Sequence, residues 1–385
     1  MKYGWDKFKE EAQEVLAKAI IESKILGETN VNKPDDLVIV DIISNINENP
    51  PSNVLADLAF PCFVMTKKFN CASPAVIAKK LVEAAKAKKS DWKYVGRVEE
   101  SGSFVNFIAD DQYFSREIVN EILNTNDCYG SMSGNGNKIG IEYVSPNTNK
   151  PLHLGHARNA FLGSALSRIA GFAGDEVLKF NLFSDRGIHI CKSMLAYQKW
   201  GDDQTPETLG LKPDHFVGKY YQMFEQKAHE NPSLEDEAQA MLKSWENGDE
   251  QVRGLWQKMN SWFFTGAKQT LQRVGADFDK IYLESEIYTE GKQIIEQALS
   301  DGKCYRLPDG AIEADLEEKK LGKKILLRQD GTAVYIVQDL FLAKKKFEDF
   351  ALDLSVYVVA DEQKYHFDVL FELLDRFGIA DRTKN

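Results

Sequence analysis

The residues best suited to chemistry lie in one turn of the chain, where Lys150 precedes the tetrapeptide His153-Leu154-Gly155-His156. A strand-like apolar run, residues 139–144, comes before this turn, and apolar residues at helical spacing follow it. Both imidazoles and the lysine ammonium therefore fall where a helix begins. Because a helix N-terminus offers unpaired amides and a partial positive charge, the pattern predicts a site for phosphate.

The two histidines are the candidate catalytic groups of this turn, together with Lys150. Their imidazoles could donate hydrogen bonds to a triphosphate and stabilise the negative charge that grows as pyrophosphate leaves. Gly155 would let a nucleotide approach the backbone closely, so His153, Gly155 and His156 are the candidate nucleotide-binding residues. An isolated His-x-Gly-His more often caps or packs a helix, so the assignment depends on the rest of the chain.

The elements that must position this turn belong to the second of two predicted domains. A chain of 385 residues, 43% of them hydrophobic, is long enough for two or more cores. The segment 124–138 is rich in Asn, Gly and Ser and has the composition of a linker. We therefore expect an α+β domain at residues 1–123 and an α/β domain at residues 139–385.

Within the second domain, strand-like runs alternate with helical segments, which predicts a mainly parallel sheet. A charged, helix-prone region at about 200–262 interrupts the alternation and is interpreted as a helical insertion. An Asp-Gly between two strand-like runs predicts a hairpin at 325–335. The expected strands are residues 139–144, 177–183, 333–337 and 354–359.

The N-terminal domain shows a mixture of helical and strand patterns. Helical spacing predicts a helix that includes Phe8, and a proline in the first turn predicts another at 74–87. Residues 104–108 are expected to form a strand, and residues 113–123 a helix.

Composition excludes several classes of protein. No stretch resembles a secretory signal, and no apolar run approaches the ~20 residues that span a bilayer. The five cysteines are never spaced Cys-x-x-Cys, which argues against a disulfide framework and a structural metal site. A net charge of −11 still allows a nucleic-acid substrate, since a basic lane can coexist with an acidic exterior. We expect a soluble, cytoplasmic monomer without membrane contact.

The run Ser145–His156 reads Ser-Pro-Asn-Thr-Asn-Lys-Pro-Leu-His-Leu-Gly-His. It resembles the HIGH signature of class I aminoacyl-tRNA synthetases, in the form found in the arginine enzymes. Residues 57–60 and 104–107 resemble, more weakly, the extra domain that these enzymes carry ahead of the catalytic fold. Further resemblances follow in the family's order, namely Asp185-Arg186-Gly187, Asp330-Gly331-Thr332 with Tyr335 and Asp339, and residues 358–363 with His366.

The resemblance implies a Rossmann-like catalytic domain that activates arginine with ATP and transfers it to tRNA(Arg). Magnesium is expected with the triphosphate, and catalysis would rest on positioning and electrostatic stabilisation. A planar, permanently cationic guanidinium needs acidic partners. The resemblance makes Asp339 the expected guanidinium partner, and the residues that it places around arginine are Glu142, Asn147, Tyr335, Asp339 and Gln363.

The resemblance also implies that the N-terminal domain contacts the outer corner of the tRNA. Five lysines could supply phosphate contacts there, although a solvated helix face is at least as good an explanation for any one of them. They are Lys79, Lys80, Lys86, Lys88 and Lys89.

Two departures from the family pattern qualify these expectations. Val337-Gln338 stand where many members have Thr-Arg, and no KMSKS-like loop follows the segment that holds Gln363. The lysine-rich run 319–324 precedes that segment instead. We therefore expect a truncated enzyme of impaired activity that also lacks an anticodon-binding domain. A cysteinyl or glutamyl enzyme, or a tRNA-binding module without activity, is the alternative.

Overall fold

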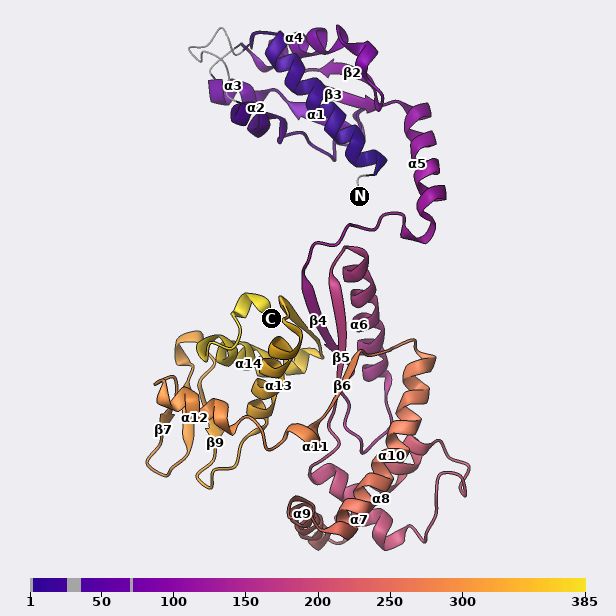
Figure 1. Cartoon of the computed structure of the whole chain (residues 1–385), viewed down its shortest axis with the longest axis vertical. Coiled ribbons are helices and arrows are strands. Elements are labelled where there is room, and N and C mark those ends of the chain that lie inside the picture. The colour runs from indigo at the N-terminus through magenta and orange to yellow at the C-terminus, as the bar shows by residue number, and fades with distance from the viewer. Residues whose placement is uncertain (1–2, 26–35, 70–71) are drawn as a thin grey trace. The chain divides into compact units, whose positions relative to one another are not determined.

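The computed structural model describes residues 3–25, 36–69 and 72–385, and the chain forms two compact units, Met1–Met132 and Ser133–Asn385 (Figure 1). The division falls inside segment 124–138, whose first residues are helical rather than irregular. None of the helices in the described parts of the chain is long and apolar enough to cross a membrane.

The first unit combines helices with a three-stranded antiparallel sheet of order β1-β3-β2. Helix α4 packs against β2, β3 and α1, and Phe8, Leu16, Leu81 and Phe107 are completely buried in the shared core. The expected helices and strand are found as α1, α4, α5 and β3. The elements are α1 (Gly4–Glu22), α2 (Asp36–Ile43), β1 (Leu58–Pro61), α3 (Phe63–Phe69), α4 (Pro74–Lys86), η2 (Lys89–Asp91), β2 (Val95–Ser101), β3 (Phe104–Ala109), α5 (Asp111–Thr125) and η3 (Asn126–Cys128).

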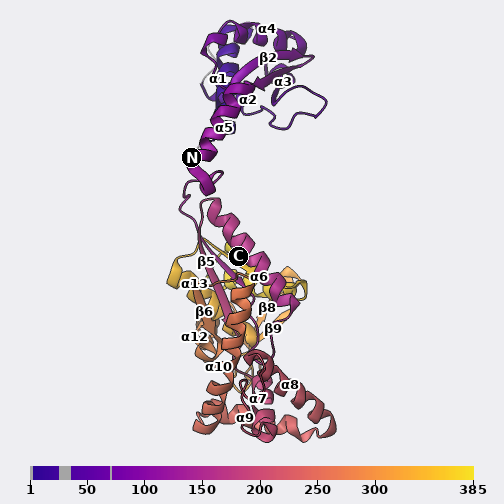
Figure 2. The ribbon, with the colours of Figure 1, turned by 90° about the vertical axis from the view of Figure 1, so that its right-hand side faces the viewer.

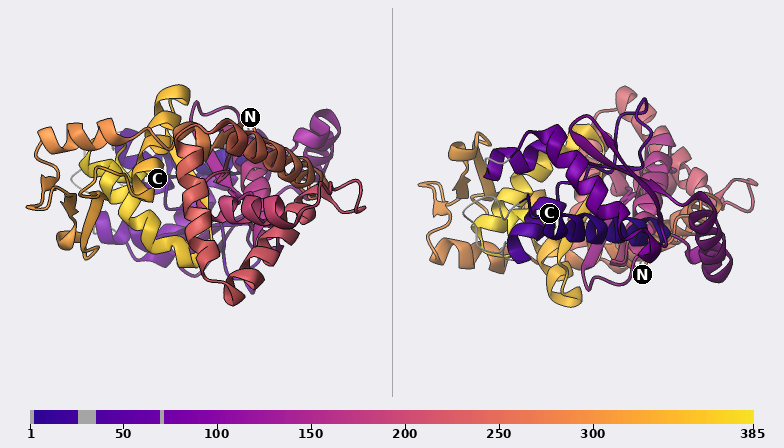
Figure 3. Two further views of the ribbon diagram at one scale, coloured as in Figure 1. Left: turned by 90° about the horizontal axis from the view of Figure 1, so that it is seen from below. Right: turned by 90° about the horizontal axis from the view of Figure 1, so that it is seen from above.

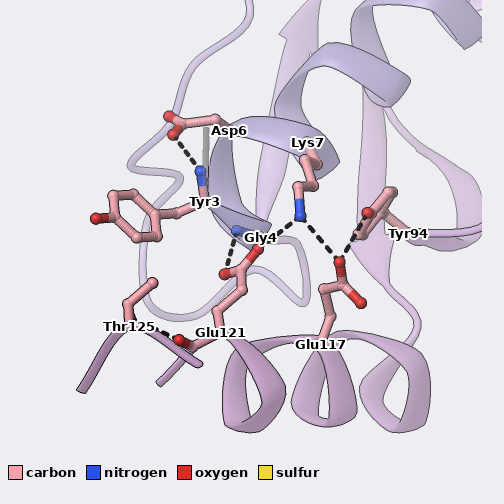
Figure 4. Close-up of polar contacts among 8 residues, drawn as sticks. All are labelled: Tyr3, Gly4, Asp6, Lys7, Tyr94, Glu117, Glu121 and Thr125. Atoms are coloured by element: carbon pink, nitrogen blue, oxygen red, sulfur yellow. Dashed lines mark hydrogen bonds and ion pairs between the residues drawn. The ribbon is translucent and has the colours of Figure 1, made fainter. Parts of the chain in front are cut away.

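Polar contacts tie α5 to the start of α1 (Figure 4). The Lys7 ammonium lies 2.6 Å from a carboxylate oxygen of Glu121 and 2.9 Å from one of Glu117, and these hydrogen bonds raise the pKa of Lys7. Glu121 also accepts the backbone N–H of Gly4 at 2.9 Å, one of the donors that a helix start leaves without an intrahelical partner. The two carboxylates therefore hold α5 against α1.

The second unit is built on a four-stranded parallel sheet of order β10-β4-β5-β6, which confirms the predicted α/β fold. The strands of this sheet and the helices that connect or follow them are β4 (Lys138–Tyr143), α6 (Leu154–Phe172), β5 (Glu176–Phe183), β6 (Lys280–Leu283), α11 (Glu284–Ile287), α12 (Lys292–Ser300), α13 (Tyr335–Phe350), β10 (Leu354–Val358), η5 (Asp361–Gln363), α14 (Lys364–Arg376) and η6 (Arg382–Lys384).

Four helices lie between β5 and β6 in the chain, namely α7 (Ile188–Trp200), α8 (Pro213–Glu230), α9 (Ser233–Glu246) and α10 (Glu250–Arg273). They gather at one end of the parallel sheet (Figures 1 and 2). Phe216, Tyr220 and Phe263 are completely buried among them. The region expected as an insertion, about 200–262, contains α8, α9 and the first part of α10.

A second, antiparallel sheet comprises β7 (Tyr305–Arg306), β8 (Ile312–Asp315) and β9 (Lys323–Leu327), with η4 (Glu317–Lys319) between β8 and β9. It lies on the opposite side of the second unit from the four insertion helices (Figure 3). Sequence patterns predicted little of it beyond the run that became β9.

The predicted strand at 333–337 is wrong. The predicted hairpin at 325–335 is present in short form, with a bridge between Leu327 and Ala333 and backbone hydrogen bonds from Val334 to Leu326 and from Arg328 to Thr332. Helix α13 begins at Tyr335 instead. Aromatic and β-branched residues favour a strand there, but buried residues of α13 recur at helical spacing and pack against α12 and α14. This tertiary packing stabilises the helix over the strand that the local sequence favours.

Helix α6 presents small residues to the sheet. Its buried residues are Ala160, Gly163, Ser164 and Ser167, whereas its larger apolar side chains face outward. A Cβ atom at Gly163 would lie 2.2 Å from Cγ of Tyr143 on β4. The backbone of α6 therefore approaches β4 closely at this point.

We expect Gly163→Ala to lower the free energy of unfolding by about 1 to 3 kcal/mol, because the added methyl group must displace the buried Tyr143 ring. Gly171→Ala on the same helix is the matched control, since a Cβ there would meet no atom closer than 4.0 Å. It should raise the free energy of unfolding by about 0.5 to 1 kcal/mol. Urea unfolding of both variants checks this, and equal midpoints would contradict it.

Candidate functional site

The candidate site lies where the order of the parallel strands reverses. From β4 the chain proceeds to β5 and β6 on one side, and β10 later pairs with the other edge of β4. Open α/β sheets bind ligands beyond the carboxyl ends of their strands at such a point. Glu142 of β4 and Tyr357 of β10 are paired in register, each one residue before its strand ends.

The chain leaves β4 through a strained turn. Val144 and Ser145 have φ values of 77° and 39°, and a β-branched residue rarely adopts the first. Ser145 donates its N–H to Oδ1 of Asn181 at 2.9 Å and its hydroxyl to Glu142 at 3.0 Å, and the hydroxyl accepts the N–H of Leu182 at 3.3 Å. Such strain persists only where the surroundings over-determine the backbone, and it concentrates at functional sites.

The two histidines cap the start of α6. Nδ1 of His153 accepts the N–H of Gly155 at 3.1 Å, and the N–H of His153 donates to Nδ1 of His156 at 3.2 Å. The ring centroids are 3.9 Å apart. Gly155 leaves room for this arrangement, because a Cβ there would lie 2.9 Å from Cε1 of His153. The capping role expected of an isolated His-x-Gly-His is therefore present, and it uses only Nδ1 of each ring.

The hydrogen bonds at Nδ1 place the ring protons of the neutral imidazoles on Nε2. Burial is the main cause that lowers the pKa of His156 to about 4, and the neighbouring His153 and Lys150 contribute to the same shift. His156 is consequently neutral at pH 7 and can only donate a hydrogen bond, without contributing charge. The ammonium of Lys150, which is exposed, is the permanent positive charge of the turn.

A cleft of about 370 Å³ opens beside this turn. One wall includes His153 and His156, and the other is formed by Thr270, Leu271 and Val274 at the end of α10. Pro151, just before the histidines, lies against α8, where a Cβ at Gly218 would be 2.4 Å from its Cδ. The insertion helices therefore support the turn and bound the cleft.

The residues expected around arginine in the last part of the chain lie on α13 and at the start of α14. Tyr335 is the first residue of α13 and is exposed, and Asp339 follows one turn later on the same face. A carboxylate oxygen of Asp339 lies 2.7 Å from Nε2 of His366, and this hydrogen bond raises the pKa of His366. Gln363 is exposed immediately before α14.

Glu142 is held in a buried ion pair. One carboxylate oxygen bonds to the ammonium of Lys346 on α13, which is completely buried, and the other accepts the hydroxyl of Ser145. The ring of Tyr357 lies 4.6 Å from Nζ of Lys346. Burial raises the pKa of the Tyr357 hydroxyl. The positive charge of Lys346 lowers that pKa, whereas the carboxylates of Glu142 and Asp339 raise it further. Both carboxylates are therefore close enough to influence the same ring.

The segment Asp185-Arg186-Gly187 joins the sheet to the insertion. The carboxylate of buried Asp185 accepts the N–H of Ser285 at 2.8 Å and its hydroxyl at 2.7 Å. The guanidinium of Arg186 stacks on the ring of Tyr288 at 4.1 Å and pairs with Glu246 of α9. These contacts hold the end of β5 against α9 and α11, so the segment has a structural role.

The structure gathers the expected residues into two groups. Lys150, His153, Gly155 and His156 form the turn at α6, and Tyr335, Asp339 and Gln363 lie on α13 and before α14. Asn147, between β4 and the turn, is exposed and bridges to Ser184.

Two residues of this site, Lys346 and Ser145, were not among the site residues predicted from the sequence. No pattern distinguishes Lys346 from its neighbours Lys344 and Lys345, because only the fold buries it. Ser145 did carry a signal, since it begins the run that resembles the synthetase signature.

On the first unit, the expected tRNA-contacting lysines lie on α4 and just after it. Lys79, Lys86, Lys88 and Lys89 are exposed, and Lys80 is half-buried. Lys88 pairs with Glu22 at 3.6 Å.

In the described residues, no group of three or more His, Cys, Asp or Glu side chains could hold a metal ion. The described cysteines, Cys62, Cys128, Cys191 and Cys304, are free. Cys71 lies outside the described residues.

Comparison with known proteins identifies relatives for both units. Residues 118–384 match the family described as tRNA synthetases class I (R), catalytic domain, and residues 7–109 match the Arginyl tRNA synthetase N terminal domain. A curated arginine–tRNA ligase of Treponema denticola is 44% identical over 86% of this chain and 56% of its own length. One of Amoebophilus asiaticus is 49% identical over 66% of this chain and 45% of its own length. The chain thus spans about half the length of these curated relatives.

Solved structures share the fold. An arginyl-tRNA synthetase of Thermus thermophilus has a TM-score of 0.65 at 20% identity and covers 98% of this chain and 64% of its own. One of Plasmodium falciparum has a TM-score of 0.65 at 14% identity and covers 98% and 63%. Both matched families are named for arginine enzymes, which favours that interpretation over a cysteinyl or glutamyl enzyme. With its catalytic region and its N-terminal region both matched, the chain belongs to the class I arginyl-tRNA synthetase family.

Proposed function

We propose that the protein acts in arginine activation. In the first step a carboxylate oxygen of arginine attacks the α-phosphorus of ATP, arginyl-adenylate forms and pyrophosphate leaves. In the second a ribose hydroxyl of the terminal adenosine of tRNA(Arg) attacks the activated carbonyl and AMP leaves. One observation carries the proposal. The start of α6, with Lys150 and two imidazoles, follows β4, and the Asp339–His366 pair lies on the helices that flank β10, the strand beside β4.

The phosphate side of the site uses the turn before α6. His153 and His156 would donate from Nε2 to the triphosphate, and Lys150 would supply positive charge as pyrophosphate departs. Gly155 belongs to the same cradle, because the absence of a side chain there leaves the backbone open to close approach by a nucleotide. Magnesium would enter with ATP and be held mainly by phosphate oxygens and water, since the nitrogen groups of this turn are poor ligands for it.

The arginine side uses the face of α13. Asp339 would take the guanidinium in the plane of its carboxylate, with Tyr335 beside it. Asn147, Gln363 and Glu142 would hold the remaining polar atoms of the amino acid. In the first unit, the lysines of α4 would contact tRNA phosphates.

Pyrophosphate exchange into ATP, measured with arginine in the presence and absence of tRNA(Arg), tests the activity. Exchange that depends on arginine supports the proposal. Binding of tRNA without any exchange would instead support the alternative of a tRNA-binding module.

Asp339→Asn should weaken arginine binding by about 2 to 5 kcal/mol while leaving ATP binding nearly unchanged, because an amide cannot match the charge of the guanidinium. Asp349→Asn is the matched control, since Asp349 lies on the same helix in an exposed pair with Lys345. Calorimetric titration with arginine, lysine and an ATP analogue measures these affinities. A loss below ~0.5 kcal/mol, the level of an exposed pair, would remove Asp339 from the arginine site.

The affinity for arginine should rise with pH across the titration of His366. The pair with Asp339 stabilises the free protein fully below the pKa of an unfolded histidine, and this contribution is lost as pH rises through the raised folded value. A bound guanidinium competes with protonated His366 for Asp339, so binding releases a proton. Titrations between about pH 6 and about pH 9 measure this. His366→Asn, which retains a donor but does not titrate, should flatten the profile, and an unaltered profile would contradict the competition.

Reversing charge on α4 should weaken tRNA binding. Lys79 and Lys86 are seven residues apart and share a helix face. In the double variant Lys79→Glu/Lys86→Glu, the slope of log affinity against log salt should fall in magnitude by about 1 to 2. The control, Lys18→Glu/Lys24→Glu, changes two exposed lysines of the same unit. Equal slopes in both variants would mark the α4 lysines as a solvated face.

A further inference from the structure

The buried ion pair between Lys346 and Glu142 joins the arginine-side helix α13 to the strand that leads into the phosphate-side turn of the proposed function. Lys346 lies seven residues after Asp339 on α13, and Glu142 lies near the end of β4, before the strained turn. The ammonium is surrounded by the rings of Phe180, at 5.6 Å, and Tyr357, at 4.6 Å. Little water can reach it, so its contact with Glu142 is directional and persistent.

Glu142 also contacts the turn that follows β4. Its second oxygen accepts the hydroxyl of Ser145, whose N–H is in turn fixed by Asn181 of β5. A continuous path of three bonds therefore runs from α13 through β4 and the turn to β5. The same turn leads to the capped histidines, so its conformation determines where the phosphate side begins.

A gain in folding stability does not explain why a charged pair, Lys346 and Glu142, is buried at this position. A buried ion pair is often no more stabilising than well-packed apolar residues of the same volume, because both ions lose their hydration. An apolar pair would fill the same space, but it could not accept the hydroxyl of Ser145 or fix its direction. The arrangement is explained if orientation is what the pair provides.

We propose that Lys346 and Ser145 are positioning residues that, through Glu142, fix the arginine-side helix α13 to the phosphate-side turn at residues 144–145. Lys346 itself touches neither substrate. Its effect on arginine and ATP is exerted through Glu142, so this inference rests on the proposed function for its ligand readout.

The test is a double-mutant cycle with Lys346→Met, Ser145→Ala and both together, using calorimetric titration with a non-hydrolysable ATP analogue. Each single variant should weaken binding by about tenfold or more, since a turn that is no longer held in place must be ordered when the ligand binds. Because both act through Glu142, the double variant should be at most about threefold worse than the worse single variant. Multiplying losses in the double variant, or unchanged affinities, would overturn the proposal.

Two controls separate positioning from general stability. Lys345→Met removes an exposed ion pair on the same helix and should leave affinity unchanged. Leu373→Ala removes a completely buried side chain of α14 and should lower the melting temperature without changing the affinity measured well below it. If Leu373→Ala weakens ATP-analogue binding as much as Lys346→Met does, the ion pair serves stability alone and the proposal is wrong.

A measurement without ligand keeps the two proposals distinguishable. Amide hydrogen exchange in the peptide that contains residues 142–149 should speed up in Lys346→Met and not in Lys345→Met. If the unmutated chain binds neither arginine nor the analogue, the proposed function fails while this exchange result still decides whether the link holds the turn. Unchanged exchange in Lys346→Met would overturn the link itself.

Discussion

Strand β4 is hydrogen-bonded along both edges, to β10 on one side and to β5 on the other. All three strands run in the same direction, so the chain leaves each of them at the same edge of the sheet. This constraint brings the turn after β4, the segment after β10 and the joint after β5 into one neighbourhood, although they are far apart in sequence. The strain at Val144 and Ser145 is tolerated because both neighbouring strands limit where that turn can go.

The two sides of the site use opposite electrostatic means. On the α6 side, the imidazoles of His153 and His156 line the cleft, and burial keeps His156 uncharged near neutrality. On the α13 side, the carboxylate of Asp339 is already hydrogen-bonded to His366 in the free protein. In the proposed function, an incoming guanidinium would displace His366 from Asp339, whereas an incoming phosphate would meet the imidazoles and the ammonium of Lys150. Discrimination against other amino acids would therefore depend on α13.

The sequence was sufficient to predict features with local physical causes. The strand before the histidine turn and the helix after it follow from periodicity and from the proline and glycine positions. The α13 error shows the limit, since Tyr335 to Val337 favour a strand locally and packing against α12 and α14 makes them helical. Lys346 shows it more clearly. Its burial depends on a strand more than 200 residues earlier in the chain, which no local pattern encodes.

The same long separation affects how the protein is made. Lys138 at the start of β4 donates its N–H to Asp353, and the two residues are 215 positions apart. During synthesis at about 5 to 20 residues per second, the outer edge of β4 is exposed for roughly 10 to 40 s before β10 has been made. An unpaired strand edge is a template for wrong partners. The second unit should therefore depend on chaperones more than the first, whose sheet is complete within its first 110 residues or so.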